Sequence, residues 1–331
     1  MNKQQIAVIG GGSWGTALIK ILCKGTKHIN WWLRNPDDIK HIRQFRHNRR
    51  YLSSVRLMEE NLQLSSQLDK VIFSSDVLIF AVPSAFLKDV MRSVKKESLE
   101  NKIIFSAVKG MVPGDNLLVG EYFHQYFEIP LSRIGVIAGP CHAEEVALEK
   151  LSYITVASQD AQVAKNMAKA LRCRYVRTIC SDDIYGTEYA AVLKNVVSVA
   201  SGICRGLGYG DNFQAVLISN AIREIKRFVD KVHPIDRDIK DSAYLGDLLV
   251  TAYSQFSRNR TFGTMVGKGY SVKSAMMEMG MIAEGYYAVK CIKEVNKKYG
   301  VKMPISDAVF NILYEKISPM IEINIMADEL D

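Results

Sequence analysis

Short apolar runs alternate with longer amphipathic segments through the first half of the chain. The runs are rich in β-branched and aromatic residues and read "QIAVIG", "INWWLR", "VLIFAVP", "KIIFSAV", "IGVIAGP" and "YITVAS". Between them, segments such as "WGTALIKILCKG" have helical periodicity, and this one is expected to end at Gly25. Buried strands that alternate with helices predict a parallel sheet covered by helices on both faces.

The strand pattern fades near residue 185, and helical periodicity replaces it. In "TEYAAVLKNVVSVASGIC", four apolar residues recur on one helical stripe: Tyr189, Val192, Val196 and Ala200. Further helical patterns follow, including "NFQAVLISNAIREIKRFV" and "GYYAVKCIKEVNKKYG". We therefore expect an α/β domain over residues 1–185 and an all-helical domain over residues 186–331.

Three glycines stand between the first expected strand and the first expected helix. Gly10, Gly12 and Gly15 form a GxGxxG pattern. In a dinucleotide-binding turn, these positions permit the tight bend, the approach of a pyrophosphate and close helix–strand packing. The free N–H groups of the helix N-terminus then face the phosphates. The alternative is a glycine-rich loop without a ligand. The context of strand, turn and helix favours a Rossmann-type doubly wound sheet with a bound dinucleotide.

Arg34 stands at the end of the second expected strand, 19 residues after Gly15. NAD sites often place an acidic residue there, which binds the ribose hydroxyls. An arginine instead suits the 2′-phosphate of NADP(H), which is the cofactor that the sequence favours. Alternatively, Arg34 stacks on the adenine and both NAD(H) and NADP(H) bind.

Lys194 is the only charged residue between Tyr189 and Cys204. Such a lysine either extends to solvent or is buried for a purpose. Burial without a partner would lower its pKa and remove its proton. A buried proton donor therefore needs a carboxylate nearby, and Asp247 in "YLGDLLVT" is the candidate.

The run "SQFSRNRTFG" groups two guanidinium groups with neutral hydrogen-bonding side chains. Ser257, Arg258, Asn259 and Arg260 suit a phosphate clamp. The alternative is a polar loop on the surface.

Charge and cysteine content narrow the function further. The net charge of +8 indicates either a basic solvated surface or a site that attracts phosphorylated anions. No nucleic-acid-binding motif occurs, so no nucleic-acid partner is expected. The six cysteines form no CxxC pair, so we expect no metal site and no disulfide framework. No apolar run is long enough to cross a membrane, and no signal-peptide pattern is present, which favours the cytoplasm.

Together these segments resemble the bacterial NAD(P)-dependent glycerol-3-phosphate dehydrogenases over almost the whole chain. The matching runs are "GGGSWGTA", "FAVPS", "AVKGM", "AGPCHAEEVA", "LKNVVSVASG", "GLGYGDN", "LGDLLVT" and "SRNRTFG". The resemblance implies a Rossmann domain followed by a helical domain, and a homodimer. It also implies reduction of dihydroxyacetone phosphate, a small phosphorylated substrate, to sn-glycerol 3-phosphate for glycerophospholipid synthesis.

The resemblance also assigns roles to individual residues. Lys194 would exchange the proton in catalysis, supported by Lys109 and Asp247. Substrate contacts would come from Lys109, Gly139, Cys141, Lys194, Asp247, Ser257, Arg258 and Asn259. Besides the three glycines, cofactor contacts would come from Ser13, Trp14, Arg34, Tyr51, Lys109, Ala143, Arg258, Ile282 and Glu284.

Three positions depart from the family pattern. Cys141 and His142 stand where the family usually has serine or threonine followed by phenylalanine. A thiol is a weaker hydrogen-bond donor than the hydroxyl group that the family usually has here. His142 is interpreted as a residue of the pocket wall, and the alternative is a polar group that supports the residues touching the substrate. Asn220 occupies the place of an arginine that many members carry.

Overall fold

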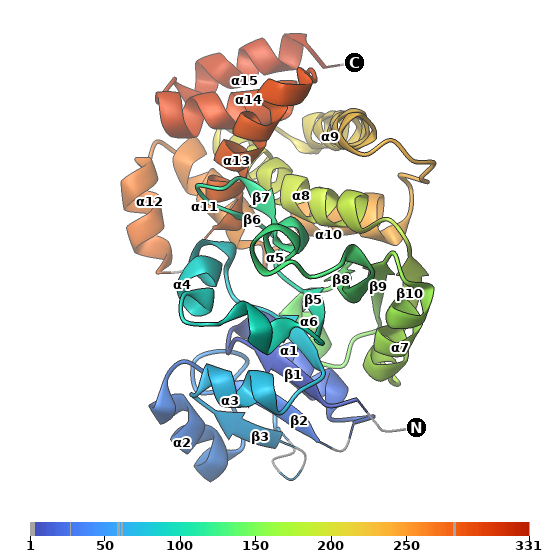
Figure 1. Ribbon diagram of the computed structural model, residues 1–331. Coiled ribbons are helices and arrows are strands. Elements are labelled where there is room, and N and C mark those ends of the chain that lie inside the picture. The colour runs from blue at the N-terminus through green and yellow to red at the C-terminus, as the bar shows by residue number, and fades with distance from the viewer. Residues whose placement is uncertain (1–3, 27, 58–59, 61, 281–282, 331) are drawn as a thin grey trace. The chain divides into compact units, whose positions relative to one another are not determined.

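The computed structural model describes residues 4–26, 28–57, 60, 62–280 and 283–330 (Figure 1). The chain divides into two compact units. The first comprises residues 1–108 and 119–184, and the second comprises residues 109–118 and 185–331. The division expected at residue 185 did not include the short excursion 109–118.

The first unit is built on an eight-stranded sheet with the order β10-β9-β8-β5-β4-β1-β2-β3. Its strands are β1 (Ile6–Ile9), β2 (Ile29–Trp32), β3 (Leu62–Ser65), β4 (Val77–Phe80), β5 (Ile103–Ser106), β8 (Ile134–Ala138), β9 (Ser152–Ser158) and β10 (Val176–Ser181). β1 lies between β2 and β4, with Ile6 opposite both Ile29 and Val77. The chain therefore proceeds outward from β1 in one direction and then returns to cross to the other side, which is the doubly wound arrangement.

Helices of the first unit form two groups. α1 (Ser13–Leu22) contacts α6 (Ala143–Ala147) and α7 (Ala161–Leu171). α3 (Leu68–Phe73) and α5 (Val119–Phe127) both contact the 3₁₀ turn at Lys96–Leu99. α2 (Pro36–Phe45) packs on β3, and α4 (Leu87–Met91) follows β4. Apolar side chains of the sheet and of α1 form one buried core.

Local chemistry explains several helix boundaries in this unit. The side chain of Asn35 accepts a hydrogen bond from the amide of Asp37, and Pro36 begins α2. Asp160 caps α7 in the same way. α1 ends at Leu22, three residues before Gly25, where its end was expected.

Most strand pairs are parallel, as the apolar runs predict, but β8 and β9 are antiparallel. β9 and β10 are parallel to each other. β3 and β10, at the two edges, had no counterpart in the sequence prediction. Each has a single buried residue, the others being partly or fully exposed, and neither contains a continuous apolar run.

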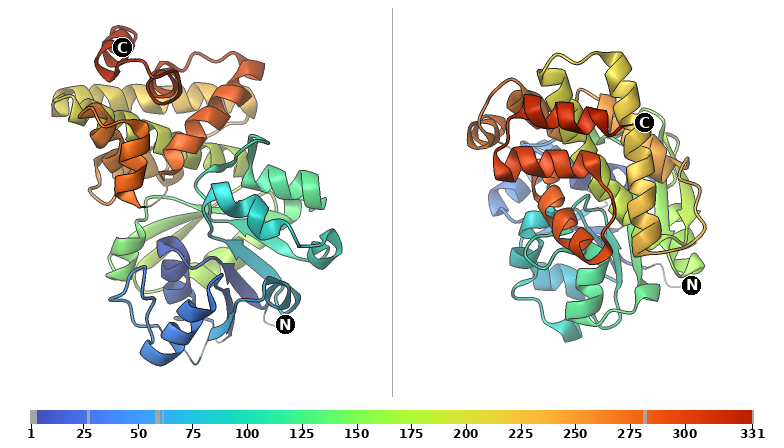
Figure 2. Two further views of the ribbon diagram at one scale, coloured as in Figure 1. Left: turned by 90° about the vertical axis from the view of Figure 1, so that its left-hand side faces the viewer. Right: turned by 90° about the horizontal axis from the view of Figure 1, so that it is seen from above.

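The second unit is helical, apart from a small hairpin of β6 (Met111–Val112) and β7 (Leu117–Leu118). Its helices are α8 (Ile184–Gly206), α9 (Asp211–Val232), α10 (Asp247–Tyr253), α11 (Arg258–Gly267), α12 (Val272–Met279), α13 (Glu284–Tyr299), α14 (Pro304–Phe310) and α15 (Pro319–Asp328). α14 and α15 lie side by side (Figure 2). No helix in the described part of the chain is long and apolar enough to cross a membrane.

α8 is the central helix of this unit and is buried on all sides from Tyr189 to Cys204. The backbone of α8 lies close to that of α11. This is seen at Gly202, where a side chain would collide with the carbonyl oxygen of Arg260. A side chain at Gly263 would likewise collide with the carbonyl oxygen of Val199. These glycines let the two helix backbones meet, which brings the polar residues of α8 within reach of the first residues of α11.

Candidate active site

The glycine turn lies at the carboxyl end of β1, in the first unit. Gly10 has φ +127, a conformation that favours glycine, and a side chain there would lie 2.6 Å from the carbonyl oxygen of Ala81. A side chain at Gly15 would collide with the carbonyl oxygen of Gly10. The carbonyl of Gly10 also accepts a hydrogen bond from the indole of Trp31 at 2.9 Å. The turn is therefore both tight and fixed.

The same turn meets the requirements of a dinucleotide phosphate site. A side chain at Gly12 would meet nothing within 4 Å, so the backbone there faces open space. Within the described chain, no side chain caps the N-terminus of α1, which begins at Ser13. The first amides of α1 are therefore oriented toward this space, where they can bind phosphate. Ser13 and Trp14 are the first residues of α1 and are partly buried.

Two more of the expected cofactor residues, Arg34 and Tyr51, lie in the first unit. Arg34 follows β2 and is exposed. Tyr51 is half-buried, and its amide donates to the side chain of Asn48 at 3.3 Å. The same Asn48 side chain donates to the carbonyl of Gly11 at 3.0 Å. Tyr51 is thus connected to the glycine turn through a single buried amide group.

Gly139, Cys141 and Ala143 follow β8. Gly139 has φ +115, and a side chain there would lie 2.9 Å from the carbonyl oxygen of Tyr153. The buried thiol of Cys141 donates to the carbonyl of Gly139 at 3.2 Å. α6 begins at Ala143, and His142 directly precedes it. The thiol of Cys141 is therefore bonded to the backbone of its own turn.

The second unit brings two lysines and one aspartate together. Lys194 of α8 forms a buried ion pair with Oδ1 of Asp247, the first residue of α10. Nζ of Lys109 lies 3.7 Å from Oδ2 of the same carboxylate. This Oδ2 is buried and accepts no hydrogen bond from the described residues. Two cations thus share one anion, and one carboxylate oxygen has unused acceptor capacity.

Burial decides the protonation of Lys194. Removal of its ammonium group from water lowers its pKa, and the neighbouring Lys109 adds to this effect, so that the net pKa is about 7 even beside Asp247. Asp247 acts in the opposite direction and raises the pKa of Lys194. A lysine with a pKa near neutrality can both give and take a proton under ordinary conditions.

A chain of amide groups runs beside this cluster. The backbone N–H of Gly285 donates to Oδ1 of Asn259, and Nδ2 of Asn259 donates to Oδ1 of Asn195 at 2.9 Å. Nδ2 of Asn195 in turn donates to the carbonyl of Lys109 at 2.6 Å. The chain connects α13, α11 and α8 to the segment that carries Lys109. It therefore holds the backbone of that lysine in place.

The hydroxyl groups of Ser198 and Ser257 lie 2.7 Å apart at the contact of α8 with α11. Ser257 caps α11 by accepting from the amide of Arg260, so the run that suits a phosphate clamp is the start of a helix and not the polar loop given as the alternative. Arg258 is the first residue of α11 and is exposed, whereas Asn259 is buried. An exposed guanidinium beside a helix N-terminus suits an anion.

Three more positions were singled out from the sequence: Glu284, Ile282 and Asn220. Glu284 begins α13 and is partly buried. Ile282 lies outside the described residues. Asn220 lies in α9, where its side chain donates to the carbonyl of Val216 within the same helix. No group of His, Cys, Asp or Glu side chains suited to a metal ion occurs among residues that the structure describes.

Sequence reasoning missed Asn48, Asn195 and Ser198. Each is a polar residue with its side chain buried, at 2%, 5% and 0% exposure respectively. Asn195 and Ser198 lie within the apolar run of α8. Polar residues in such a run indicate buried hydrogen-bonded side chains, because buried polar groups require partners. Asn48 stands in a basic run that resembles a solvated surface, and nothing in the local pattern marked it.

Comparison with known proteins agrees with this architecture. Residues 5–164 match the family model for the N-terminus of NAD-dependent glycerol-3-phosphate dehydrogenase, and residues 183–324 match the model for its C-terminus. A glycerol-3-phosphate dehydrogenase [NAD(P)+] of Chlorobium chlorochromatii is 33% identical over 311 residues, covering 94% of this chain and 93% of its own. A protein of the same name from Staphylococcus aureus is 33% identical over 315 residues, covering 95% of both chains.

Solved structures show the same relationship. The crystal structure of glycerol-3-phosphate dehydrogenase from Coxiella burnetii matches with a TM-score of 0.91 and 28% identity, over 98% of this chain and 99% of its own. A ketopantoate reductase from Ralstonia eutropha matches with a TM-score of 0.60 and 12% identity, over 96% of this chain and 99% of its own. That second likeness concerns the fold alone. With matching sequence models, relatives and structure, this chain belongs to the NAD-dependent glycerol-3-phosphate dehydrogenase family.

Proposed function

We propose that this protein reduces dihydroxyacetone phosphate to sn-glycerol 3-phosphate with NAD(P)H, and so supplies the backbone of glycerophospholipids. The observation that carries the proposal is the buried ion pair of Lys194 and Asp247, with Lys109 on the second carboxylate oxygen. Lys194 has a pKa of about 7, which suits a group that donates a proton in one direction and accepts it in the other. Family membership supplies the substrate.

Negative charge develops on the ketone oxygen when the carbon is reduced. Lys194 would donate its proton to this oxygen, and Lys109 would stabilise the charge before the transfer is complete. Asp247 keeps Lys194 protonated and oriented, because it raises the pKa of a lysine that burial would otherwise neutralise. Its second oxygen has acceptor capacity for a substrate hydroxyl group.

The start of α11 would bind the substrate phosphate. Arg258 offers an exposed guanidinium there. Asn259 already uses one amide N–H and its carbonyl oxygen in the amide chain, which leaves its second N–H for the ligand. Fixing the phosphate orients the ketone, and such positioning is a large part of catalysis in reactions of two bound partners.

The glycine turn of the first unit would hold the dinucleotide phosphates. When bound, the nicotinamide supplies the hydride that the ketone carbon receives. The family accounts for a nicotinamide cofactor, and we further infer a preference for NADP(H) over NAD(H). The preference rests on the exposed Arg34 at the end of β2, where a guanidinium can pair with a 2′-phosphate.

The activity is tested with the purified protein, NADPH and dihydroxyacetone phosphate, by following the oxidation of NADPH. Lys194→Ala should lower turnover by about 10²- to 10⁴-fold, the usual effect of losing a general acid. The matched control is Lys293→Ala, because Lys293 also pairs with an aspartate, Asp307, but in a partly exposed position. The control should retain wild-type turnover.

Two results would contradict the proposal. One is a wild-type protein that oxidises NADPH with ketopantoate but not with dihydroxyacetone phosphate, which would assign the fold to a different reductase. The other is a folded Lys194→Ala protein with activity within about threefold of wild type, since a loss below about 1 kcal/mol is too small for a proton donor.

Two further properties are inferred, the first from the family resemblance and the second from the sequence. We infer that the protein forms a homodimer and acts in the cytoplasm. Light scattering of the purified protein at several concentrations measures the first, and fractionation of cells that express it measures the second. A monomer at all concentrations, or recovery with the membrane fraction, would contradict these inferences.

A further inference from the structure

The loop that follows α2 has a fixed shape. Residues 46–52, here called the 46–52 loop, begin and end with left-handed backbone at Arg46 (φ 58) and Leu52 (φ 52). The amide of Leu57 donates to the carbonyl of Arg46, and the amide of Val55 donates to that of Leu52, both at 2.8 Å. Left-handed conformations of residues other than glycine persist only where the surroundings hold them.

Asn48 connects the 46–52 loop to the glycine turn through its side chain. Its Nδ2 donates to the carbonyl of Gly11 at 3.0 Å and to the hydroxyl of Thr16 at 2.9 Å. Its Oδ1 accepts from the amides of Arg50 and Tyr51 at 3.0 and 3.3 Å. The side chain is buried, so every one of these bonds replaces water. The backbone of Arg50 is therefore held one side chain away from the turn that binds phosphates.

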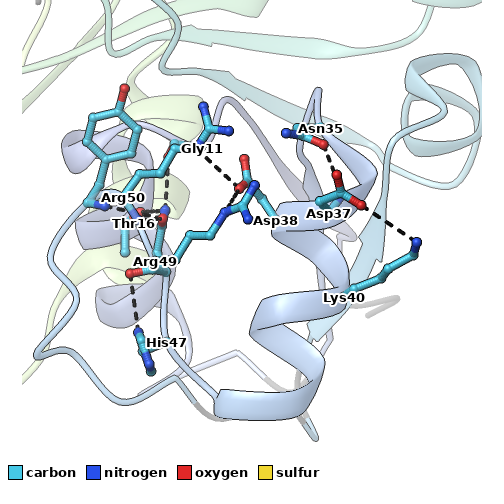
Figure 3. A network of polar contacts seen from close by, with 11 residues as sticks. Gly11, Thr16, Asn35, Asp37, Asp38, Lys40, His47, Arg49 and Arg50 are labelled. Carbon is cyan, nitrogen blue, oxygen red and sulfur yellow. Dashed lines mark hydrogen bonds and ion pairs between the residues drawn. The ribbon is translucent and has the colours of Figure 1, made fainter. Parts of the chain in front are cut away.

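Two arginines of the loop share one carboxylate. Nε of Arg49 lies 2.6 Å from Oδ1 of Asp38, whereas Nε of Arg50 lies 3.4 Å from the same oxygen (Figure 3). The Arg50 side chain is 53% exposed. One carboxylate neutralises one guanidinium, and the shorter contact belongs to Arg49. The charge of Arg50 is therefore the less compensated of the two.

Positive charge is concentrated in this part of the chain. Residues 34–51 contain six lysines and arginines and two aspartates, so they carry +4 of the net charge of +8. The segment begins with Arg34, which follows β2. It ends in the 46–52 loop, which the side chain of Asn48 connects to the glycine turn. A local excess of this size attracts a multiply charged anion more than a singly charged one.

We propose that Arg50 is a specificity-determining residue that binds the 2′-phosphate of NADP(H) together with Arg34, and that Asn48 is its positioning residue. In the free protein, Arg50 is held loosely by Asp38. A phosphate dianion competes well for it, because Asp38 keeps its closer partner Arg49 when Arg50 leaves. NAD(H) has a neutral hydroxyl group at this place and gains nothing from the exchange. The inference rests on the proposed use of a dinucleotide.

Binding of NADPH and of NADH is measured directly, by calorimetric titration without substrate. Arg50→Gln should lower the affinity for NADPH by about tenfold or more, the scale of a lost charge-assisted hydrogen bond, and leave the affinity for NADH within about twofold of the wild-type value. The matched control is Lys40→Gln, which makes the same change of charge on α2 at a lysine paired with Asp37. Figure 3 shows Lys40 directed away from Gly11 and Arg50. This control should leave both affinities within about twofold.

Two further variants separate a specific role from a structural one. Arg50→Lys keeps the charge but loses the guanidinium fork, so it should recover part of the NADPH affinity. Asn48→Ala should lower the ratio of NADPH affinity to NADH affinity, and it should add little to that ratio in an Arg50→Gln background, because both changes act on one interaction. A loop needed only for stability would lower both affinities equally.

Three results would overturn the proposal: equal weakening of NADPH and NADH in Arg50→Gln, unchanged NADPH affinity in that variant, or a wild-type protein that binds neither dinucleotide. The proposed reaction is judged separately, with dihydroxyacetone phosphate in the same preparation. A protein that selects NADPH through Arg50 but does not reduce this substrate refutes the proposed reaction and leaves the present inference standing.

Discussion

Replacing Asp247 with asparagine removes the carboxylate that Lys194 and Lys109 share. The side chains of Lys194 and Asp247 are 4% and 1% exposed, so solvent screens their interaction little. Two unit charges about 4 Å apart at an effective dielectric constant of about 20 interact with about 4 kcal/mol. That energy corresponds to about three pKa units.

The direction of the effect follows from the charges. Burial and Lys109 lower the pKa of Lys194, and Asp247 raises it, with a result of about 7. Without Asp247 the pKa of Lys194 falls well below neutrality. In the proposed mechanism reduction needs the protonated lysine, so activity is present below this pKa and is lost as the pH rises through it. The alkaline limb of the pH profile for reduction should therefore move to lower pH in Asp247→Asn.

The assay is kcat/KM for dihydroxyacetone phosphate with saturating NADPH, measured across the pH range. At pH 7 the variant should lose about 10²- to 10³-fold, the effect expected when a general acid is largely deprotonated. In the oxidation of glycerol 3-phosphate, Lys194 would accept the proton by the same mechanism, so the acidic limb should also move to lower pH. This second shift distinguishes a changed pKa from general damage to the site.

Asp307→Asn is the matched control, because Asp307 accepts a hydrogen bond from Lys293 at 2.6 Å in a partly exposed pair. Both of its pH limbs should coincide with those of the wild type. If a folded Asp247→Asn protein keeps both limbs in their wild-type positions, Asp247 does not control the proton of Lys194, and the electrostatic reasoning is refuted.

Four further outcomes are expected. Arg34→Asp should raise the Michaelis constant for NADPH more than that for NADH, and an equal change in both would mean that Arg34 does not bind the 2′-phosphate. Gly15→Ala should lower the melting temperature because its new methyl group collides with the backbone of the turn, whereas Gly12→Ala should melt like the wild type but bind NADPH less tightly. Scanning fluorimetry measures the melting temperatures, and titration with NADPH measures the affinities. Full NADPH affinity in Gly12→Ala would mean that the cofactor phosphates do not bind at this turn. Cys141→Ser should retain or improve turnover, since a hydroxyl group is a better donor than the buried thiol, and near-complete loss in a folded variant would contradict this. Burial raises the pKa of Glu224 from 4.5 to about 7. The protonated side chain therefore stabilises the fold fully below about pH 4.5, and this stabilisation, about 3 kcal/mol, is lost as the pH rises to about 7. Denaturant titrations should show this fall in the free energy of unfolding for the wild type and not for Glu224→Gln, and parallel pH profiles of the two proteins would contradict the prediction.

Local sequence was sufficient for the elements that short-range sterics decide. The glycine turn could be predicted because only glycine tolerates the backbone of Gly10 and the contact at Gly15. α8 could be predicted because its apolar stripe persists through several turns, and Lys194 was conspicuous within it. The order of the two architectures, α/β and then helical, followed from the change of period near residue 185.

Strand direction and edge strands could not be predicted in the same way. An apolar strand is buried equally well whether it is parallel or antiparallel to its neighbour. The sequences of β8 and β9 therefore do not indicate that these two strands are antiparallel. β3 and β10 are edge strands in which most residues are partly or fully exposed, so neither has the apolar run by which the buried strands could be predicted.

Only the tertiary structure decided the chemistry of the candidate site. Lys109 lies 86 residues from Asn195 in the sequence, and Asp247 lies 53 from Lys194, yet each pair is in contact. Asn48 contacts Gly11 from 37 residues away. Such contacts depend on the packing of whole helices and strands, because the burial of many side chains at once determines where each element lies. The sequence by itself could name the residue types that the reaction needs, but the pKa of Lys194 depends on how deeply the fold buries it and on which charges the fold places beside it.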